Sequence, residues 1–367
     1  MDPRIREHAE VLVDWSAQVS AGDNVIVQLD EGSIPLGIAV AECLGEREAN
    51  MVVTFNSDEL SRAYLHSFPS LDFTDDPEHA LALFEEADVF LRLRGGSNTS
   101  GMADVPMDKR QAISRARQKV REATYDTDWV STIHPTPSLA QQASMATEEY
   151  RAFAYRAMIR DWESLAGEMD RLKTRIDKGD EVRIITDNTD ISMRIEGRTA
   201  VNSAASVAYD SHNLPSGEVF TAPYATEGEV VFDVPMTLYG SPVRDVHLTF
   251  EGGEVVDVDA AEGLATIEGI LETDDGARRL GELGIGMNRD IDRYTNNILF
   301  DEKMGDTFHL ALGRAYDACL PEGEIGNESA VHVDMIADMS EDATLSIDDE
   351  VVYREGSFVW ETGFSAN

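Results

Sequence analysis

In the first half of the chain, apolar residues follow two different spacings in turn. From Pro3 onward they recur every three or four positions, as at Ile5, Ala9 and Leu12, which is typical of a helix with one buried face. Short apolar runs, such as residues 24–29, then indicate buried strands. The alternation of helices and strands predicts a mostly parallel sheet covered by helices on its faces.

The elements expected in this half follow from the same spacings and from their end signals. Asp2 and Pro3 are typical of a helix start, and Gly22 of a helix end. We expect strands at residues 24–29, 51–55 and 88–93, and helices at residues 3–21, 33–44, 58–67, 77–86, 108–122 and 147–176.

The pattern changes after the break at Lys178-Gly179, where apolar and polar residues begin to alternate. We expect strands at residues 182–186, 191–196, 229–234, 243–250 and 254–258, with helices near residues 261–271 and 275–280. Gly252-Gly253 is typical of a tight turn between two of these strands. The chain is therefore predicted to be an α/β protein of two domains. Residues 1–178 form a mostly parallel α/β domain, and residues 179–367 form a strand-rich α+β domain that carries the candidate metal site.

Charge sets this chain apart from an ordinary globular protein. Seventy Asp and Glu residues against 30 Lys and Arg residues produce a formal net charge of -40. So acidic a chain repels itself in dilute buffer, whereas salt shortens the Debye length from about 10 Å at 0.1 M to about 3 Å at 1 M. We therefore expect a protein adapted to a high-salt cytoplasm. Nucleic acid is excluded as a partner, because phosphates require clusters of Lys and Arg.

The remaining composition indicates an intracellular protein. No uninterrupted apolar stretch of about 18 residues is present, so no membrane span is expected. The N-terminus runs directly into an amphipathic pattern and lacks the apolar core of a secretory signal. Cys43 and Cys319 lack metal-site spacing and are expected to be reduced, buried thiols.

The sequence motifs of several common enzyme classes are absent from this chain. The glycines after Arg94 lack the spacing of a phosphate-binding loop, so no nucleotide cofactor is expected. The chain also lacks a G-x-S-x-G elbow, an H-E-x-x-H helix and a paired C-x-x-C.

Several acids and histidines of the last third occupy positions where apolar residues are expected. His332 and Asp334 alternate along a predicted strand and so project from one face, as two metal ligands or as a surface pair. Glu282 and Glu218 stand among Gly, Pro and aliphatic residues, where a buried carboxylate needs a partner or a metal. Taken alone, each acid is also consistent with a solvated residue on a turn, and His309 with a core histidine whose ring nitrogens are hydrogen-bonded.

Together these segments resemble the aminopeptidase T / aminopeptidase S family of metallopeptidases, the thermophilic aminopeptidases. The resemblance spans most of the chain, and five blocks carry it in the family's order. These are Thr189-Asp190, residues 213–223 with Glu218, residues 281–288 with Glu282, residues 299–316 with Glu302 and His309, and His332-x-Asp334. One departure is the spacing of six residues between Glu302 and His309, which is longer than the family pattern.

The resemblance implies a cytoplasmic, homodimeric metallo-aminopeptidase that acts on peptides. It implies two divalent metal ions, and the mixed oxygen and nitrogen donors suit Zn, Co or Mn. Six residues match the family's metal ligands: Glu218, Glu282, Glu302, His309, His332 and Asp334. Glu282 matches the ligand that the two metals share and the general base, and Tyr316 matches the family's active-site tyrosine.

Two other functions remain open at this level. His309, His332 and Asp334 alone would make the two-His, one-carboxylate triad of an Fe(II) dioxygenase, as in a dihydroxypyridine dioxygenase related to this fold family. A non-catalytic metal-binding homologue is the third hypothesis. Counting metals separates the three, since they require two divalent ions, one iron ion or none.

We predict that salt stabilises this protein. Its melting temperature is expected to rise from dilute buffer to molar KCl or NaCl, because screening removes repulsion within a chain of net charge -40. Calorimetry or circular dichroism at both salt concentrations measures the effect. An unchanged melting temperature would contradict the predicted high-salt origin.

Overall fold

The computed structural model describes residues 2–73 and 77–365, which form two compact units. The first unit holds the described residues up to Arg160 and the segment Ala205–Pro215. The second holds Asp161–Ala204 and the residues from Ser216 onward. The units thus change over between Arg160 and Asp161, while the predicted domain boundary at residue 178 stays a prediction.

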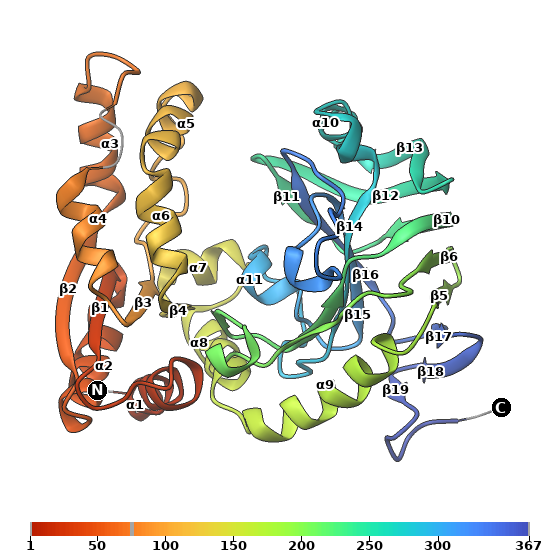
Figure 1. Ribbon diagram of the computed structural model, residues 1–367, viewed down its shortest axis with the longest axis horizontal. Helices are drawn as coiled ribbons and strands as arrows, with labels where there is room; N and C mark the ends of the chain where they lie inside the picture. Colours follow the sequence, from red (N-terminus) through yellow and green to blue (C-terminus); the bar gives the residue numbers. More distant parts are fainter. Residues whose placement is uncertain (1, 74–76, 366–367) are drawn as a thin grey trace. The chain divides into compact units, whose positions relative to one another are not determined.

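The first unit is built on a parallel sheet in the strand order β2-β1-β3-β4-β8 (Figure 1). Its strands are β1 (Asn24–Asp30), β2 (Asn50–Asn56), β3 (Val89–Arg94), β4 (Asp128–Ile133) and β8 (Asn213–Leu214). Val27 of β1 lies in register with Val53 of β2 and Leu91 of β3. The predicted parallel α/β architecture is therefore confirmed, although β4 and the late strand β8 were missed.

Helices cover this sheet. They are α1 (Pro3–Glu10), α2 (Ile34–Glu46), α3 (Asp58–Ser67), α4 (Glu78–Glu85), α5 (Met107–Ala116), α6 (Gln118–Tyr125), α7 (Pro137–Gln142) and α8 (Thr147–Met158), with the π-helix η1 (Val11–Ser16) and the 3-10 turns η2 (Glu31–Ser33) and η3 (Val207–Tyr209). α1 packs on α2, and α4 packs on α6. β2 and β3 lie on opposite sides of β1, so the connection from β1 to β2 and the connection from β2 to β3 run across the sheet in opposite directions. Because such crossovers are right-handed, α2 and α4 lie on opposite faces of the sheet.

Two predicted helices are each interrupted. The expected helix at residues 147–176 was wrong as a single element, because α8 ends at Met158 and α9 (Trp162–Ile176) begins after it. Asp161 accepts a hydrogen bond from the Ser164 backbone N–H at 3.0 Å and so caps the new helix. The expected helix at residues 108–122 is likewise divided at Arg117 into α5 and α6. Buried apolar residues stand on both sides of the first break, at Met158 and Trp162, which is why periodicity alone did not detect it.

The second unit is rich in antiparallel strands, which confirms the predicted α+β character. A nine-stranded sheet has the order β11-β12-β10-β6-β5-β17-β18-β19, with β13 paired on β12. Its strands are β5 (Glu181–Thr186), β6 (Thr189–Arg194), β10 (Tyr224–Phe232), β11 (Met236–Leu238), β12 (Ser241–Glu251), β13 (Glu254–Glu262), β17 (Thr344–Ile347), β18 (Glu350–Arg354) and β19 (Ser357–Phe358). β12 and β13 are joined by the expected tight turn at Gly252 and Gly253, both with positive φ.

A second, five-stranded sheet of this unit carries the acids and histidines. Its order is β16-β15-β14-β9-β7, and all of its pairs are antiparallel. The strands are β7 (Val201–Ser203), β9 (Glu218–Thr221), β14 (Leu280–Gly286), β15 (Thr307–Gly313) and β16 (His332–Asp338). Every residue of β14 and β15 is buried. These two central strands therefore form a rigid support for any side chain that they present.

The helices of the second unit are few. They are α9, α10 (Leu264–Leu271) and α11 (Ile298–Asp301), with 3-10 turns η4 (Asp275–Arg278) and η5 (Asp317–Cys319). α9 packs beside β7 and β9. No helix within the described residues has the length and apolar content required to cross a bilayer.

One histidine of the first unit is buried as a neutral side chain. Thr132 donates its hydroxyl hydrogen to the Leu214 carbonyl at 2.8 Å, so His8 Nε2, also at 2.8 Å, must donate to the Thr132 oxygen. Burial, with a smaller effect of His134, lowers the pKa of His8 to about 3. The fold therefore favours the uncharged ring, and its contribution to stability is complete above the unfolded pKa of about 6.5.

We predict an acid-sensitive contribution from His8. As the pH falls from 6.5 towards 3, the unfolded chain takes up a proton that the folded chain excludes, so stability falls by about 1.4 kcal/mol per pH unit. His8→Gln keeps an N–H donor for Thr132 but does not titrate. Between pH 7.5 and 5.5, at equal molar salt, the wild type should lose about 1.4 kcal/mol more than the variant in urea titrations. Equal losses would show that His8 is protonated in the folded state.

Candidate metal centre

Strand register brings five of the predicted residues to one face of the five-stranded sheet. His309 of β15 lies opposite Gly284 of β14, and Glu218 of β9 lies opposite Gly286. Side chains two residues apart share a face, so Glu282 lies on the same side as Gly284 and Gly286. β16 adds Asp334, opposite Ala311, and His332, opposite Gly313, to this face. Residues from four strands therefore meet because of their register, although more than 100 positions separate the first from the last.

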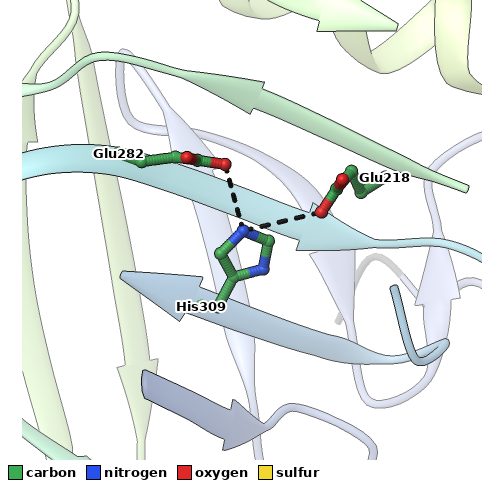
Figure 2. A group of neighbouring side chains, drawn as sticks. All are labelled: Glu218, Glu282 and His309. Atoms are coloured by element: carbon green, nitrogen blue, oxygen red, sulfur yellow. Dashed lines mark hydrogen bonds and ion pairs between the residues drawn. The ribbon is translucent and has the colours of Figure 1, made fainter. Parts of the chain in front are cut away.

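The side chains converge in two overlapping groups. Ligand atoms of Glu218, Glu282 and His309 all lie within 4.8 Å of one another, and those of Glu282, His332 and Asp334 form a second such group. Figure 2 shows the first group, in which both carboxylates point toward the imidazole of His309. Glu282 belongs to both groups and so occupies the centre.

Each carboxylate oxygen of Glu282 faces a different histidine. Oε1 lies 3.2 Å from His309 Nε2, and Oε2 lies 3.2 Å from His332 Nε2. His309 Nε2 is also 3.6 Å from Glu218 Oε2, and His332 Nε2 is 3.5 Å from Asp334 Oδ1. Glu282 therefore links the two histidines, and with them the two groups.

The outer nitrogen of His332 is held by the backbone. Its Nδ1 lies 2.8 Å from the Arg314 carbonyl oxygen, which only accepts, so Nδ1 must carry the hydrogen. Nε2, which faces the carboxylates, is then the nitrogen that binds a metal once it has lost its own proton, as in metal-binding histidines whose second nitrogen is fixed by a neighbouring acceptor. The tautomer of His332 therefore suits a metal ligand.

Gly284 leaves the space that His309 occupies. A Cβ atom on Gly284 would lie 2.0 Å from His309 Cε1 and 2.1 Å from its Nε2. The imidazole thus lies directly over the backbone of β14, between Glu282 and Glu218. No other residue type allows this approach, which is a requirement that the sequence pattern did not reveal.

In the absence of a metal, burial and neighbouring charges set the protonation of the acids and histidines in this cluster. Burial raises the pKa of Glu218 and raises that of Glu302 to about 8. Burial also works against a charged His309, but the hydrogen bond to Glu282 and the nearby carboxylates outweigh it and raise the His309 pKa to about 9. The same competition raises the pKa of His332 to about 11. The carboxylates therefore hold positive charge strongly, as a cation site must.

Lys303 is a member of this cluster that sequence reasoning missed. It is completely buried, its Nζ lies 3.3 Å from Glu218 Oε1, and it forms an ion pair with Glu302. These carboxylates raise its pKa against the opposing effect of burial. The sequence did contain a sign of this role, because the chain has only five lysines and one of them directly follows the candidate ligand Glu302.

The two remaining predicted residues lie beside the two groups. Glu302 lies outside both of them and contacts Lys303. Tyr316 is about half exposed, and its ring centroid is 4.9 Å from that of His332. Burial, followed by the charge of Glu282 and other carboxylates, raises the Tyr316 pKa, so its hydroxyl stays protonated and can donate.

A cavity of about 290 Å³ opens beside His332 and Asp334. Its walls include the apolar side chains of Met236, Leu238 and Ile298, with Tyr239 and Tyr294. A cavity with mainly apolar walls and a few polar groups at one end is typical of a small-ligand site. Of the predicted ligands, His332 and Asp334 therefore face a space that is large enough for a side chain.

The donor set fits divalent cations. Carboxylate oxygens and imidazole nitrogens suit Zn, Co or Mn, Glu218 Oε2 lacks a hydrogen-bond partner, and His332 presents the required tautomer. Acids and histidines in two groups that share a carboxylate are typical of metal-dependent enzymes.

Comparison with known proteins identifies the family within this class. The chain belongs to the thermophilic metalloprotease family (M29), whose sequence profile matches residues 1–358. The resemblance inferred from the five sequence blocks is therefore confirmed, and so is the prediction of a metallopeptidase.

Named relatives agree with this assignment. Aminopeptidase 2 of Geobacillus stearothermophilus is 28% identical over 98% of both chains, and aminopeptidase T of Thermus thermophilus is 31% identical over 40% of this chain and 37% of its own. The solved structure of wild-type AmpT from Thermus thermophilus covers 97% of this chain and 99% of its own, with a TM-score of 0.84 and 26% identity. A 2,5-dihydroxypyridine dioxygenase from Pseudomonas putida covers 98% of this chain and 97% of its own, with a TM-score of 0.59 and 13% identity, which is a likeness of fold alone.

We predict that Gly284→Ala disrupts the centre by displacing His309. The added methyl group overlaps the imidazole, and such overpacking costs about 1–3 kcal/mol, with loss of bound metal. Gly269→Ala is the control, because a Cβ at this position on α10 meets no atom within 4 Å. Melting temperature and metal content by plasma mass spectrometry are the measurements. If Gly284→Ala matched Gly269→Ala in both, the close approach would not matter.

Proposed function

We propose that this chain is an aminopeptidase that releases N-terminal residues from peptides with the help of two divalent metal ions. The observation that carries the proposal is the position of Glu282, whose two oxygens face different histidines in two overlapping ligand groups. The names of the relatives support the reaction, since aminopeptidase 2 and aminopeptidase T are named for it.

The two ligand groups support an assignment of the residues that would hold the metals. We place one ion with Glu218, Glu282 and His309, and the other with Glu282, His332 and Asp334. Glu302 stays a predicted ligand, and its ion pair with Lys303 supports a second role in balancing charge. Divalent cations in this centre would polarise the scissile carbonyl and lower the pKa of water towards neutrality.

The chain's own side chains would supply the proton transfer and the hydrogen bond of the reaction. Glu282 accepts a proton from the attacking water and returns it to the leaving amine. Tyr316, which stays protonated beside His332, donates a hydrogen bond to the developing oxyanion. The cavity lined by Met236 and Leu238 receives the substrate's N-terminal side chain and excludes water around it.

The dioxygenase alternative is less consistent with this geometry. An iron triad of His309, His332 and Asp334 leaves Glu218 and Glu282 without a function. Yet Glu282 lies closer to both histidines than Asp334 lies to His332. The fold likeness to the dioxygenase adds no support, because the fold does not determine the reaction.

The proposal extends to the surroundings of the enzyme. We place it in a high-salt cytoplasm, with peptides as substrates and without nucleic-acid or membrane partners. Support comes from the net charge of -40 and from Cys43 and Cys319, which are both free and buried.

We predict that Glu282→Gln and Tyr316→Phe separate the metal-binding role from the catalytic one. Tyr316→Phe should keep the wild-type metal content and lose about 100- to 1,000-fold in the turnover of an aminoacyl-anilide, the usual effect of one lost oxyanion donor. Glu282→Gln should nearly abolish turnover. Metal content then shows whether it also loses an ion, because both roles of Glu282 use the same two oxygens.

The matched substrate control is an N-acetylated anilide, which an aminopeptidase leaves intact. Assays use metal-loaded protein in molar salt. Wild-type protein that holds one iron ion and consumes oxygen with an aromatic diol, but releases no amino acid from any unblocked peptide, would establish the dioxygenase instead. Full activity of Glu282→Gln would contradict the assignment of the centre.

A further inference from the structure

Lys303 is a buried cation in a chain that has few lysines. The sequence contains only five, and the side chain of Lys303 is 0% exposed. The other four are exposed or partly exposed: Lys109, Lys119, Lys173 and Lys178. Burying an ammonium group is costly unless acids surround it. The charge of Lys303 therefore acts inside the protein, among the acids of the candidate metal centre.

The two carboxylate oxygens of Glu218 have different neighbours. Oε1 lies 3.3 Å from Lys303 Nζ, whereas Oε2 lies 3.6 Å from His309 Nε2 (Figure 2). Oε2 has no hydrogen-bond partner, so it is the oxygen that stays available to a metal. Lys303 thus occupies one side of this ligand, and a single carboxylate separates the ammonium from the group formed with His309 and Glu282.

Glu302 is held by the same ammonium. Lys303 forms an ion pair with Glu302, whose side chain is 18% exposed and lies outside both ligand groups. Because Glu302 is also a predicted metal ligand, the ammonium and a metal ion require the same carboxylate. A divalent ion can gain this ligand only by displacing Lys303 from it.

Backbone hydrogen bonds fix the position of Lys303. Its N–H donates to the Phe300 carbonyl at 3.0 Å, and its carbonyl accepts from the Asn288 N–H at 3.2 Å. The side chain of Asn288, which is buried, donates to the Ser216 carbonyl at 2.9 Å, two residues before Glu218. The lysine and the acid are therefore tied to the same asparagine, and no part of the lysine side chain reaches the surface.

A count of charges indicates what this lysine does to a metal ion. The centre contains four carboxylates, those of Glu218, Glu282, Glu302 and Asp334. Two divalent ions would balance these four charges by themselves, so the ammonium of Lys303 adds a surplus positive charge. Like charges repel strongly in a buried site, because little water screens them.

We propose that Lys303 is a built-in competitor of the metal ions, which occupies oxygens of Glu218 and Glu302 and lowers the affinity of the centre for divalent cations. The inference rests on the two-ion centre of the proposed function. The ammonium acts in two ways, by holding ligand oxygens and by repelling the ions. The enzyme therefore exchanges its metal with the surroundings, and its loading follows the metal supply.

The first test is the metal affinity of Lys303→Met. Methionine is unbranched and flexible, so it fills the space without the charge. Full-length protein, cleared of metal by chelation, is titrated with Co²⁺ in molar KCl and followed by visible absorption and calorimetry. Lys303→Met should bind at least about tenfold more tightly than the wild type. Lys178→Met is the control, because it removes the same charge from an exposed position and should bind like the wild type.

A second pair of variants repeats the comparison with one buried acid fewer, so that it can be read even if Lys303→Met does not fold. Glu302→Gln is compared with the double variant that also carries Lys303→Met. The double variant should again bind Co²⁺ more tightly, by a smaller factor than in the first pair. The difference between the two factors measures the competition for Glu302.

Unchanged or weaker Co²⁺ binding on loss of Lys303, in the pairs that fold, would overturn the proposal. That result would leave the proposed function intact if the wild type holds two ions and releases amino acids from peptides. Failure of the wild type and of every variant to bind Co²⁺ would instead contradict the metal centre itself, and with it the competition.

Discussion

Carboxylates buried close together must be neutralised, and this constraint shapes the second unit of the protein. Glu218, Glu282, Glu302 and Asp334 share one site, where their mutual repulsion in a medium of low polarity would oppose folding. Two protonated imidazoles and the ammonium of Lys303 offset part of this charge. Divalent cations offset it more effectively, because each carries two charges and accepts several ligands at once. Binding of divalent metal, which the metalloprotease family uses, would therefore stabilise the site.

The sheet that holds these groups makes their positions reproducible. Four adjacent strands contribute ligands from one face, and the two central strands are buried throughout. Side chains on such strands have little freedom, so the distances between ligands do not depend on mobile loops. Gly284 and the Arg314 carbonyl complete the arrangement. The first leaves room for the ring of His309, and the second fixes the tautomer of His332.

Negative charge acts differently on the surface of the same molecule. There the acids are solvated and separated, and mobile ions screen them within about 3 Å at molar salt. Buried carboxylates are beyond the reach of such ions and require bound partners at defined positions.

The sequence by itself determined the class of each half, because the spacing of apolar residues reports directly whether a segment buries one helical face or one face of a strand. It also marked Glu218, Glu282, His309, His332 and Asp334, because charged residues among glycines and aliphatic residues are costly unless they have partners. It did not reveal β4 or the return of Asn213–Leu214 to the first sheet, since these strands pair with distant segments. It also did not reveal the breaks at Arg117 and before Asp161.

Only the tertiary structure decided which oxygen of Glu282 faces which histidine, and that Lys303 lies among the acids. Strand register sets those distances, and a shift of one residue in β14 would turn Glu282 to the opposite face of the sheet.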